Sequence, residues 1–232
     1  MNNKKVSIII PARNEEKYIQ KAIESLMVQK YELMEIIVVV NGSEDATFEI
    51  AKRYADKTLN FPEPMCPAKA RNEGVKISEG DIFVFLDADS QLLNGAIKKI
   101  TEDLKKNTFG TCLGKADKDN FKGKLFFLFK NWIHILRIYK GVIGGVFFCH
   151  RDIFLKVNGF NQTKKVAEFQ DFIKRATTLG VKYKLFRNCY AAISLRRFEE
   201  KGYLKTFLFW IKWKIASFFK KDKKIAEEYF KK

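Results

Sequence analysis

The chain has few cysteines, and none lie in the close spacing typical of metal-binding or redox motifs. Cys66, Cys112, Cys149 and Cys189 are scattered along the sequence without any C-x-x-C pair. No signal peptide precedes the first apolar run, which begins at Val6. We therefore expect reduced thiols in the core of a cytoplasmic protein.

Long hydrophobic runs are also missing from the two most basic stretches. Neither 123–151 nor 201–232 reaches the roughly 20 uninterrupted apolar residues of a membrane-spanning helix. The first has no acidic residue, the second has ten lysines against three acids, and both are rich in aromatic residues. This mixture is typical of helices that lie in a membrane interface. The sequence predicts such helices at about 123–140 and 203–219, and a peripheral position at the inner face of the membrane.

Charge of one sign dominates the composition. The 44 lysines and arginines against 27 acidic residues give a formal net charge of +17, which favours a polyanionic partner such as an anionic bilayer, a phosphorylated substrate or nucleic acid. No motif of a nucleic-acid-binding module is present, so we do not expect nucleic acid as a partner.

Strands and helices alternate along the first part of the chain. Apolar, β-branched runs predict strands at Val6–Ile10, Glu35–Val40, Lys57–Phe61 and Ile82–Leu86, with a helical pattern between each pair. This alternation is typical of an α/β domain with a mostly parallel sheet flanked by helices. With 232 residues, we expect one such domain over 1–200 and a basic, aromatic, amphipathic helical extension over 201–232.

Polar side chains follow the three strongest strands, at 13–15, 41–43 and 87–89. Parallel strands present their carboxyl ends, and any ligand site there, along one edge of the sheet. If the chain is extended, Asp87 and Asp89 project to the same side and offer oxygen ligands to a hard cation. Alternatively, Asp89-Ser90 caps the next helix, and the other two loops are a helix N-terminus and a plain turn.

Six segments in order extend this pattern: SIIIPARNEEKYI, EIIVVVNGSEDAT, AKARNEGVKISEGDIFVFLDADS, GGVFFCHRDIFLKVNGF, AEFQDF and SLRRFE. Together, over residues 5 to 198, they resemble the family 2 glycosyltransferases with the Rossmann-like GT-A fold. The resemblance implies a nucleotide-diphosphate sugar as donor, Mn²⁺ or Mg²⁺ as cofactor, and transfer with inversion to an acceptor hydroxyl. Combined with the basic helices, it implies a lipid-linked or otherwise membrane-proximal acceptor.

The resemblance also assigns residues. It implies nucleotide-sugar contacts for Pro11, Ala12, Arg13, Asn14, Glu15, Asn41, Lys69, Arg71, Asp87, Ala88, Asp89, Arg196 and Arg197. Within this set Asp87 and Asp89 match the D-x-D motif, in which the second acid tends toward the metal and the first toward the ribose. Asn41 stands where relatives usually have an aspartate near the base. The arginine pair after Ser194 resembles a motif that approaches the diphosphate, or it forms surface ion pairs.

Two further sets of residues follow from the resemblance. Gly144-Gly145 and 158–160 match its acceptor-side segment, with turn glycines and a packed aromatic as the alternative reading. His134 and His150 lack the context of a histidine that completes a metal shell, so we expect both to be structural.

The chain departs from the family pattern where the catalytic base is expected. Relatives have Glu-Asp at this point, whereas this chain has Glu168-Phe169 followed by Gln170 and Asp171. Phenylalanine cannot accept a proton, so Glu168 and Asp171 are the candidate bases, and Glu168 is favoured because it adjoins the lost position. Alternatively, both are first-turn acids of a helix, and the protein is a catalytically impaired one that binds nucleotide sugars.

Overall fold

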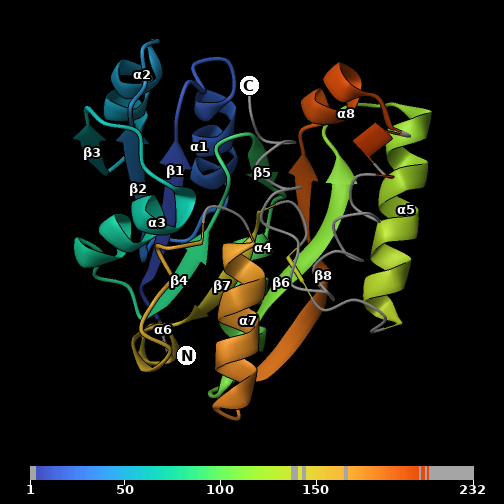
Figure 1. The fold of residues 1–232 in the computed structure, drawn as a ribbon. Coiled ribbons are helices and arrows are strands. Elements are labelled where there is room, and N and C mark those ends of the chain that lie inside the picture. Colours follow the sequence, from blue (N-terminus) through green and yellow to red (C-terminus); the bar gives the residue numbers. More distant parts are fainter. Residues whose placement is uncertain are drawn as a thin grey trace.

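The computed structural model describes residues 4–136, 141–142, 145–164, 167–203, 205–206 and 208. Eight strands form one sheet in the order β3-β2-β1-β4-β7-β6-β8-β5, with helices packed around it (Figure 1). Most of the predicted helix at 203–219 and most of the predicted extension over 201–232 lie outside the described residues. The division at residue 200 therefore stays a prediction.

The first half of the sheet is parallel, as predicted. Its elements are β1 (Val6–Ala12), α1 (Ile19–Met27), β2 (Met34–Asn41), α2 (Thr47–Tyr54), β3 (Lys57–Phe61), α3 (Pro67–Lys76) and β4 (Ile82–Phe85). The pairs β1–β2, β2–β3 and β1–β4 are all parallel. Their carboxyl ends consequently share one edge.

Strand β1 continues through Pro11, where we expected it to stop. Pro11 is paired with Val39 in the ladder with β2. On the other side, β4 ends opposite Ile9, whose carbonyl accepts from Leu86 N at 3.1 Å. The backbone polar groups of residues two apart in a strand point to the same neighbouring strand, so an N–H at Pro11 would point, like the polar groups of Ile9, toward β4. At the level of Pro11, however, β4 has already ended. The proline therefore removes no ladder hydrogen bond.

The second half of the sheet is mixed, which the sequence did not predict. Its strands are β5 (Ser90–Leu92), β6 (Thr108–Ala116), β7 (Phe147–His150) and β8 (Lys182–Ile193). Strand β7 runs antiparallel to both β4 and β6, and β5 is antiparallel to β8, whereas β6 and β8 are parallel. A register shift between Cys112 and Leu113 interrupts the β6–β8 ladder.

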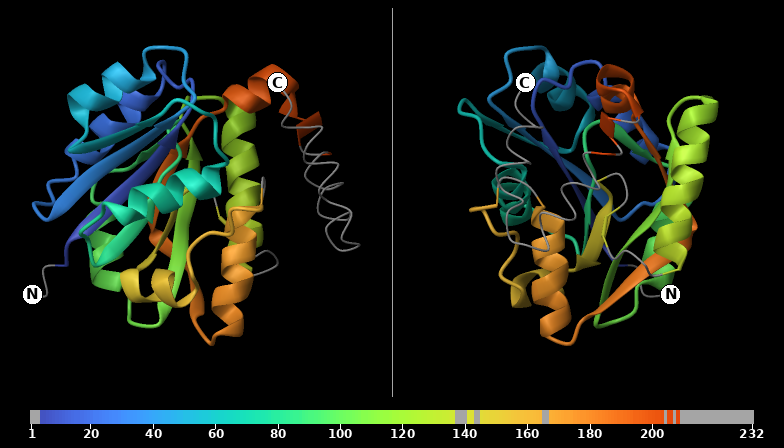
Figure 2. Two further views of the ribbon diagram at one scale, coloured as in Figure 1. Left: turned by 60° about the vertical axis from the view of Figure 1, so that its left-hand side comes forward. Right: turned by 45° about the vertical axis from the view of Figure 1, so that its right-hand side comes forward.

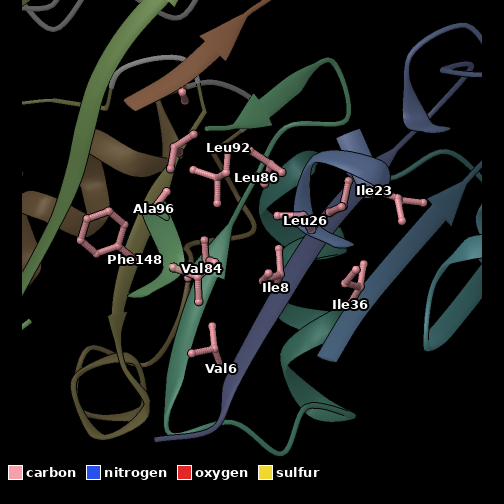
Figure 3. Close-up of a cluster of buried hydrophobic side chains, with 14 of the residues drawn as sticks. Val6, Ile8, Ile23, Leu26, Ile36, Val84, Leu86, Leu92, Ala96 and Phe148 are labelled. Carbon is pink, nitrogen blue, oxygen red and sulfur yellow. The ribbon is translucent and has the colours of Figure 1, made fainter. Parts of the chain in front are cut away.

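Alternating residues of the central strands build a core on each face of the sheet. Val6, Ile8, Val84 and Leu86 pack with α1 and the start of α4 on one face (Figure 3). Ile9, the phenylalanines of β4 and Phe147 of β7 pack on the other face with α3, α6 and α7. Both faces of β1 and β4 are buried, which explains why these strands read as unbroken apolar runs.

The remaining helices are α4 (Ala96–Asp103), α5 (Phe121–Ile135), α6 (Arg151–Lys156), α7 (Glu168–Thr178) and α8 (Arg196–Lys201). Helix α4 begins at Ala96 with Gly95 as its N-cap. Asp89 and Ser90 therefore do not cap it, and that alternative is wrong. Helix α5 packs on β6 and runs along the side of the molecule, with α8 beside its N-terminal end (Figure 2).

Candidate functional site

The loops after β1 and β2 are joined by side chain-to-backbone hydrogen bonds. Asn14 N donates to Ser43 Oγ at 3.1 Å, and Asn14 Oδ1 accepts from Glu44 N at 2.9 Å. Glu15 N donates to Thr47 Oγ1 at 2.7 Å. Asn14 adopts a positive φ of 53°, a conformation that asparagine tolerates better than most residues. The two loops therefore form one rigid rim at the carboxyl edge of the sheet.

Arg71 joins the end of β4 to the start of α7. Its guanidinium contacts Asp87 Oδ1 at 2.8 Å and Glu168 Oε1 at 2.7 Å, and the arginine is only 2 % exposed. Two carboxylates on one buried guanidinium use the fork geometry that lysine lacks. Arg71 thus sets the positions of the first D-x-D acid and of one candidate base.

Aromatic rings support this arginine from below. The Arg71 guanidinium carbon lies 4.4 Å from the centroid of Phe169 and 5.8 Å from that of Phe160. Phe169 is itself buried and lies 5.6 Å from the Phe147 ring, centroid to centroid. The residue at the lost base position therefore serves as a packed platform under Arg71.

Two glycine-containing segments pack close to the same cluster. A Cβ placed on Gly145 would overlap the carboxylate of Asp87, and Gly145 has a φ of +68°. Asn72 holds the other segment, since its side chain donates to Phe160 O at 2.8 Å and accepts from Phe160 N at 3.0 Å. Asn72 is thereby engaged with the backbone of the segment that the resemblance relates to the acceptor. Gly144 lies outside the described residues.

The second D-x-D acid has a different arginine. Arg196 Nη2 contacts Asp89 Oδ2 at 2.9 Å, and its two Nη atoms contact Glu15 Oε2 at 2.7 Å and Oε1 at 2.5 Å. The Arg196 guanidinium carbon also lies 4.5 Å from the ring centroid of Tyr18. Arg196 is therefore a partly buried ion-pair partner of Glu15 and Asp89, and its contact with a nucleotide sugar stays a prediction.

The pKa of Asp89 is raised to about 6, first by burial and then by the neighbouring Asp87 carboxylate, whereas Arg196 opposes both effects. The segment from Asp87 to Ser90 is a turn, with Ser90 N donating to Asp87 O at 3.0 Å. The expectation of an extended D-x-D segment was therefore wrong. The two carboxylates nevertheless lie close enough to repel each other.

The other residues predicted to contact the nucleotide sugar are not gathered in one cluster. Asn41 is buried, donates from Nδ2 to Ala12 O at 3.2 Å and accepts from Met65 N at 3.1 Å. Its side chain thus holds the loop backbones around the predicted base pocket. Arg13 and Lys69 are exposed at the rim, Arg197 is exposed beside Arg196, and Ala88 is buried in the core.

Asp171 pairs with a different arginine from Glu168. Its Oδ2 accepts from Arg175 Nε at 2.7 Å. Arg175 also donates to the carbonyls of Val157 and of Gly159. Of the two candidate bases, only Glu168 contacts the residues that surround Asp87, and Asp171 helps to anchor the segment before Phe160.

The donor set suits a hard divalent cation that is completed by a ligand. Asp87 and Asp89 supply carboxylate oxygens, and burial of Asp89 together with their mutual repulsion favours a further cation, although each acid already contacts one arginine. Within the described part of the chain, no group of three or more His, Cys, Asp or Glu residues could enclose a metal. Diphosphate oxygens and water would therefore complete the shell, as is usual for Mg²⁺ sites on phosphates.

Sequence reasoning missed Tyr18, Ser43 and Thr47 as supports of the site. Ser43 lies in the loop after β2 and Thr47 is the first residue of α2; Ser and Thr are common in turns and at helix starts, so their sequence context gave only a weak signal. Tyr18 precedes α1, and nothing in its sequence context marks it. As for the histidines, His150 Nε2 lies 3.1 Å from Leu104 O, and His134 lies on the buried side of α5.

Comparison with known proteins agrees with this architecture. Residues 7–156, well over half of the chain, match the family model described as glycosyl transferase family 2. An uncharacterized glycosyltransferase of Haemophilus influenzae is 36% identical over 104 residues, which are 43% of this chain and 42% of that protein. Glycosyltransferase AglE of Haloferax volcanii is 40% identical over 91 residues, 36% of this chain and 30% of that one. The chain thus spans less than half the length of these relatives.

Solved structures share the fold at low identity. The mannosyltransferase PcManGT from Pyrobaculum calidifontis, in complex with GDP-Man and Mn²⁺, superposes with a TM-score of 0.67 at 18% identity and covers 81% of this chain and 56% of that one. S. aureus TarS in complex with UDP-GlcNAc gives a TM-score of 0.64 at 19% identity and covers 81% and 58%. With the matched family model, these likenesses show that the chain belongs to glycosyl transferase family 2 and has the GT-A fold.

Proposed function

We propose that the protein is an inverting glycosyltransferase that moves a sugar, of the hexosyl class, from a nucleotide-diphosphate donor to an acceptor hydroxyl. The observation that carries this proposal is the convergence of Asp87, Asp89, Arg71, Arg196 and Glu168 at the carboxyl edge of the sheet. At one end of this group Arg196 offers a guanidinium, which is suited to a diphosphate. The opposite end holds a carboxylate suited to proton transfer.

The donor would lie along the rim formed by the loops after β1 and β2. In this arrangement 11–15 and Asn41 border the nucleoside, and Arg196 and Asp89 face the diphosphate. The solved PcManGT complex holds GDP-Man with Mn²⁺, and here Asp89, with Asp87 beside it, would hold Mn²⁺ or Mg²⁺. A bound cation neutralises the leaving diphosphate.

Glu168 is the proposed base. The acceptor hydroxyl attacks the anomeric carbon from the side opposite the diphosphate, its proton passes to the Glu168 carboxylate, and the bond from carbon to diphosphate oxygen breaks. Arg71 orients Glu168 through the 2.7 Å contact. A positioned base of this kind contributes about 10² to 10⁴-fold to the rate.

The acceptor is proposed to be a glycan or lipid at the cytoplasmic face of a membrane, with the protein bound peripherally. Support comes from the basic, aromatic helix α5, whose charged residues are all lysine. Among the described residues, no helix is both long and apolar enough to cross a bilayer.

The test is a transfer assay with radiolabelled nucleotide sugars, Mn²⁺ and membrane lipid extract. We expect transfer, or slow donor hydrolysis, with at least one common donor. Absence of both with every donor, in a protein whose melting temperature no nucleotide sugar raises, would refute the proposal. A ligand present at 100 times its dissociation constant stabilises a protein by about 2.7 kcal/mol, so binding is readily detected.

A second candidate is a nucleotide-sugar-binding protein without chemistry. The burial of Phe169 at the position of the usual base favours it. In that case nucleotide sugars raise the melting temperature, but neither transfer nor hydrolysis occurs and Glu168→Gln changes nothing. Replacement of Phe169 by aspartate is a weak test of this alternative, because it also removes the ring that packs against Arg71.

A further inference from the structure

Helix α5 presents a continuous apolar face to solvent. The α5 stripe, as we call it, consists of large hydrophobic side chains that are 45 to 79% exposed: Phe121, Leu125, Leu128, Phe129, Trp132 and Leu136. Their spacing places them on one side of the helix. Gly123, Phe127 and His134, on the opposite side, are buried. Exposed apolar faces of this extent usually mark an interaction site.

Cationic groups border the stripe at both ends. Lys122 and Lys124 are exposed on either side of its N-terminal part, and α5 itself carries no acidic residue. At the other end Arg187 Nη2 donates to Ile135 O at 3.3 Å. Arg187 lines a hollow of about 780 Å³ together with Lys182 and Lys184.

One acidic side chain in that hollow is already engaged. Asp103 Oδ2 accepts from Asn188 Nδ2 at 2.8 Å. The exposed cations around α5 are thus available for phosphate groups, apart from Lys124, which contacts the exposed Asp119 at 2.5 Å.

We propose that the α5 stripe docks on an anionic lipid bilayer. The helix lies in the interface with its phenylalanine, leucine and tryptophan side chains at the acyl boundary, and Lys122 and Arg187 contact lipid phosphates. Its 15 residues span about 22 Å, which is too short to cross a hydrocarbon core of about 30 Å. A bilayer fits better than a protein groove because cations border the apolar face at both ends.

The docking proposal adds a membrane-binding surface to the proposed function. It depends on that function only for the location of the acceptor. The buried side of α5 packs directly on the chain before Arg196. Leu195 and Phe127 form one buried cluster, and the Phe126 and Phe198 ring centroids are 4.6 Å apart. A docked α5 would thereby hold Arg196, and the part of the candidate site that is proposed to bind the donor, close to the bilayer.

The test is co-sedimentation of the full chain with phosphatidylcholine vesicles, with or without ~30% phosphatidylglycerol. We expect binding to the anionic vesicles that weakens with added salt. The double substitution Leu128→Glu/Trp132→Glu should weaken binding roughly tenfold or more. Leu155→Glu is the matched control, because Leu155 is 63% exposed on α6; it should bind as the unchanged protein does. Equal melting temperatures of the three proteins establish that each is folded.

Three results would overturn the docking proposal. In the first, the wild-type chain stays in the supernatant. In the second, the double variant sediments as well as the wild type. In the third, the wild type forms a dimer but binds no vesicles, and the double variant no longer forms that dimer. The last result would assign the stripe to a second copy of the chain. Donor binding is measured separately, by thermal shift without lipid, so loss of the proposed enzymatic function and loss of docking are distinguished.

Discussion

Gly145 and Asp87 are in such close contact that no side chain fits between them. A Cβ at position 145 would overlap the Asp87 carboxylate, and the backbone there has a φ of +68°. The position of the first D-x-D acid therefore depends on the absence of a side chain in a segment that lies far along the chain from it.

Substitution Gly145→Ala should displace Asp87 and weaken binding of a nucleotide sugar with Mn²⁺ by about tenfold or more. It should also destabilise the fold by about 1 kcal/mol, because alanine is strained at positive φ. Thermal shift against donor concentration measures the first effect and urea unfolding the second. Gly180→Ala is the control: Gly180 has a φ of +79°, and no atom of the described residues lies within 4 Å of the place that an added methyl group would take. This variant should therefore lose stability alone.

Substitution Arg71→Met should lower the free energy of unfolding by about 3 kcal/mol, since it leaves two carboxylates near each other without their cation. Arg71→Lys should recover only part of the loss, because an ammonium group lacks the planar fork that reaches Asp87 and Glu168 together. Urea unfolding measures both. Lys69→Met, an exposed change on the same helix, should have almost no effect, and an equal loss there would contradict this explanation.

Substitution Glu168→Gln should reduce kcat by about 10² to 10⁴-fold with little change in donor KM, because it removes the proposed base and retains the shape of the side chain. Asp171→Asn should leave kcat nearly unchanged and cost about 1 kcal/mol of stability through its lost pairing with Arg175. Steady-state transfer kinetics separate the two. A larger loss of kcat in Asp171→Asn would reverse the assignment.

The pKa of Asp89 predicts a pH dependence of metal binding. Because the folded pKa is raised from 3.8 to about 6, Asp89 is protonated in the folded protein below about pH 6. Affinity for Mn²⁺ in the presence of donor should therefore rise as pH increases through 6 and level off above it. Without metal, the free energy of unfolding should change with pH in the opposite direction to the Mn²⁺ affinity. Between about pH 4 and 6 the folded state binds more protons at Asp89 than the unfolded state does, so the contribution of Asp89 to stability falls as pH rises. Asp89→Asn should remove both effects in titrations of Mn²⁺ affinity and of melting temperature.

The environment of Glu35, at the edge of the sheet opposite the candidate site, predicts a contribution to stability that is lost in acid. Its buried carboxylate accepts from Ser7 Oγ at 2.5 Å and from Glu79 N at 2.6 Å, and lies 2.9 Å from Lys57 Nζ. Burial raises its pKa, but these hydrogen bonds and the lysine outweigh burial and lower it below 4.5. The resulting stability is present above about pH 4.5 and is lost as pH falls through the lowered pKa.

Glu35→Gln should reduce the free energy of unfolding at pH 7 by about 3 kcal/mol and flatten its dependence on pH below 4.5. Urea unfolding across that range measures both effects. The exposed Glu79→Gln serves as the comparison, and an equally large loss there would argue against burial as the cause.

The parallel half of the fold could be predicted because its signals are local. Runs such as 35–40 are apolar because both faces of the strand are buried, and helices of regular spacing separate them. The mixed half was not predictable in this way: β7 is a four-residue strand, too short to be recognised by period, and its antiparallel direction depends on partners far away in the chain.

Within the site, the residue types could be predicted but their pairings could not. Carboxylates at 87 and 89 were expected to act together, whereas the turn that begins at Asp87 gives each a different arginine. The sequence could not distinguish Glu168 from Asp171 as the candidate base by position. The structure distinguishes them by their partners, because Glu168 contacts Arg71 and Asp171 contacts Arg175. Sequence spacing alone placed both acids on one face.

The contact between Arg196 and Glu15 joins residues 181 positions apart, and this separation has a consequence for biosynthesis. The strands β1 to β4 end at Phe85 and can pair while the rest of the chain is still being translated, since domains tend to fold from the N-terminus as they emerge. Asp89 and Glu15 acquire their arginine only after β8 and α8 have left the ribosome. The nascent protein would therefore have the parallel half of its sheet but an incomplete candidate site, and under the proposed function it would be unable to consume nucleotide sugar until synthesis is nearly finished.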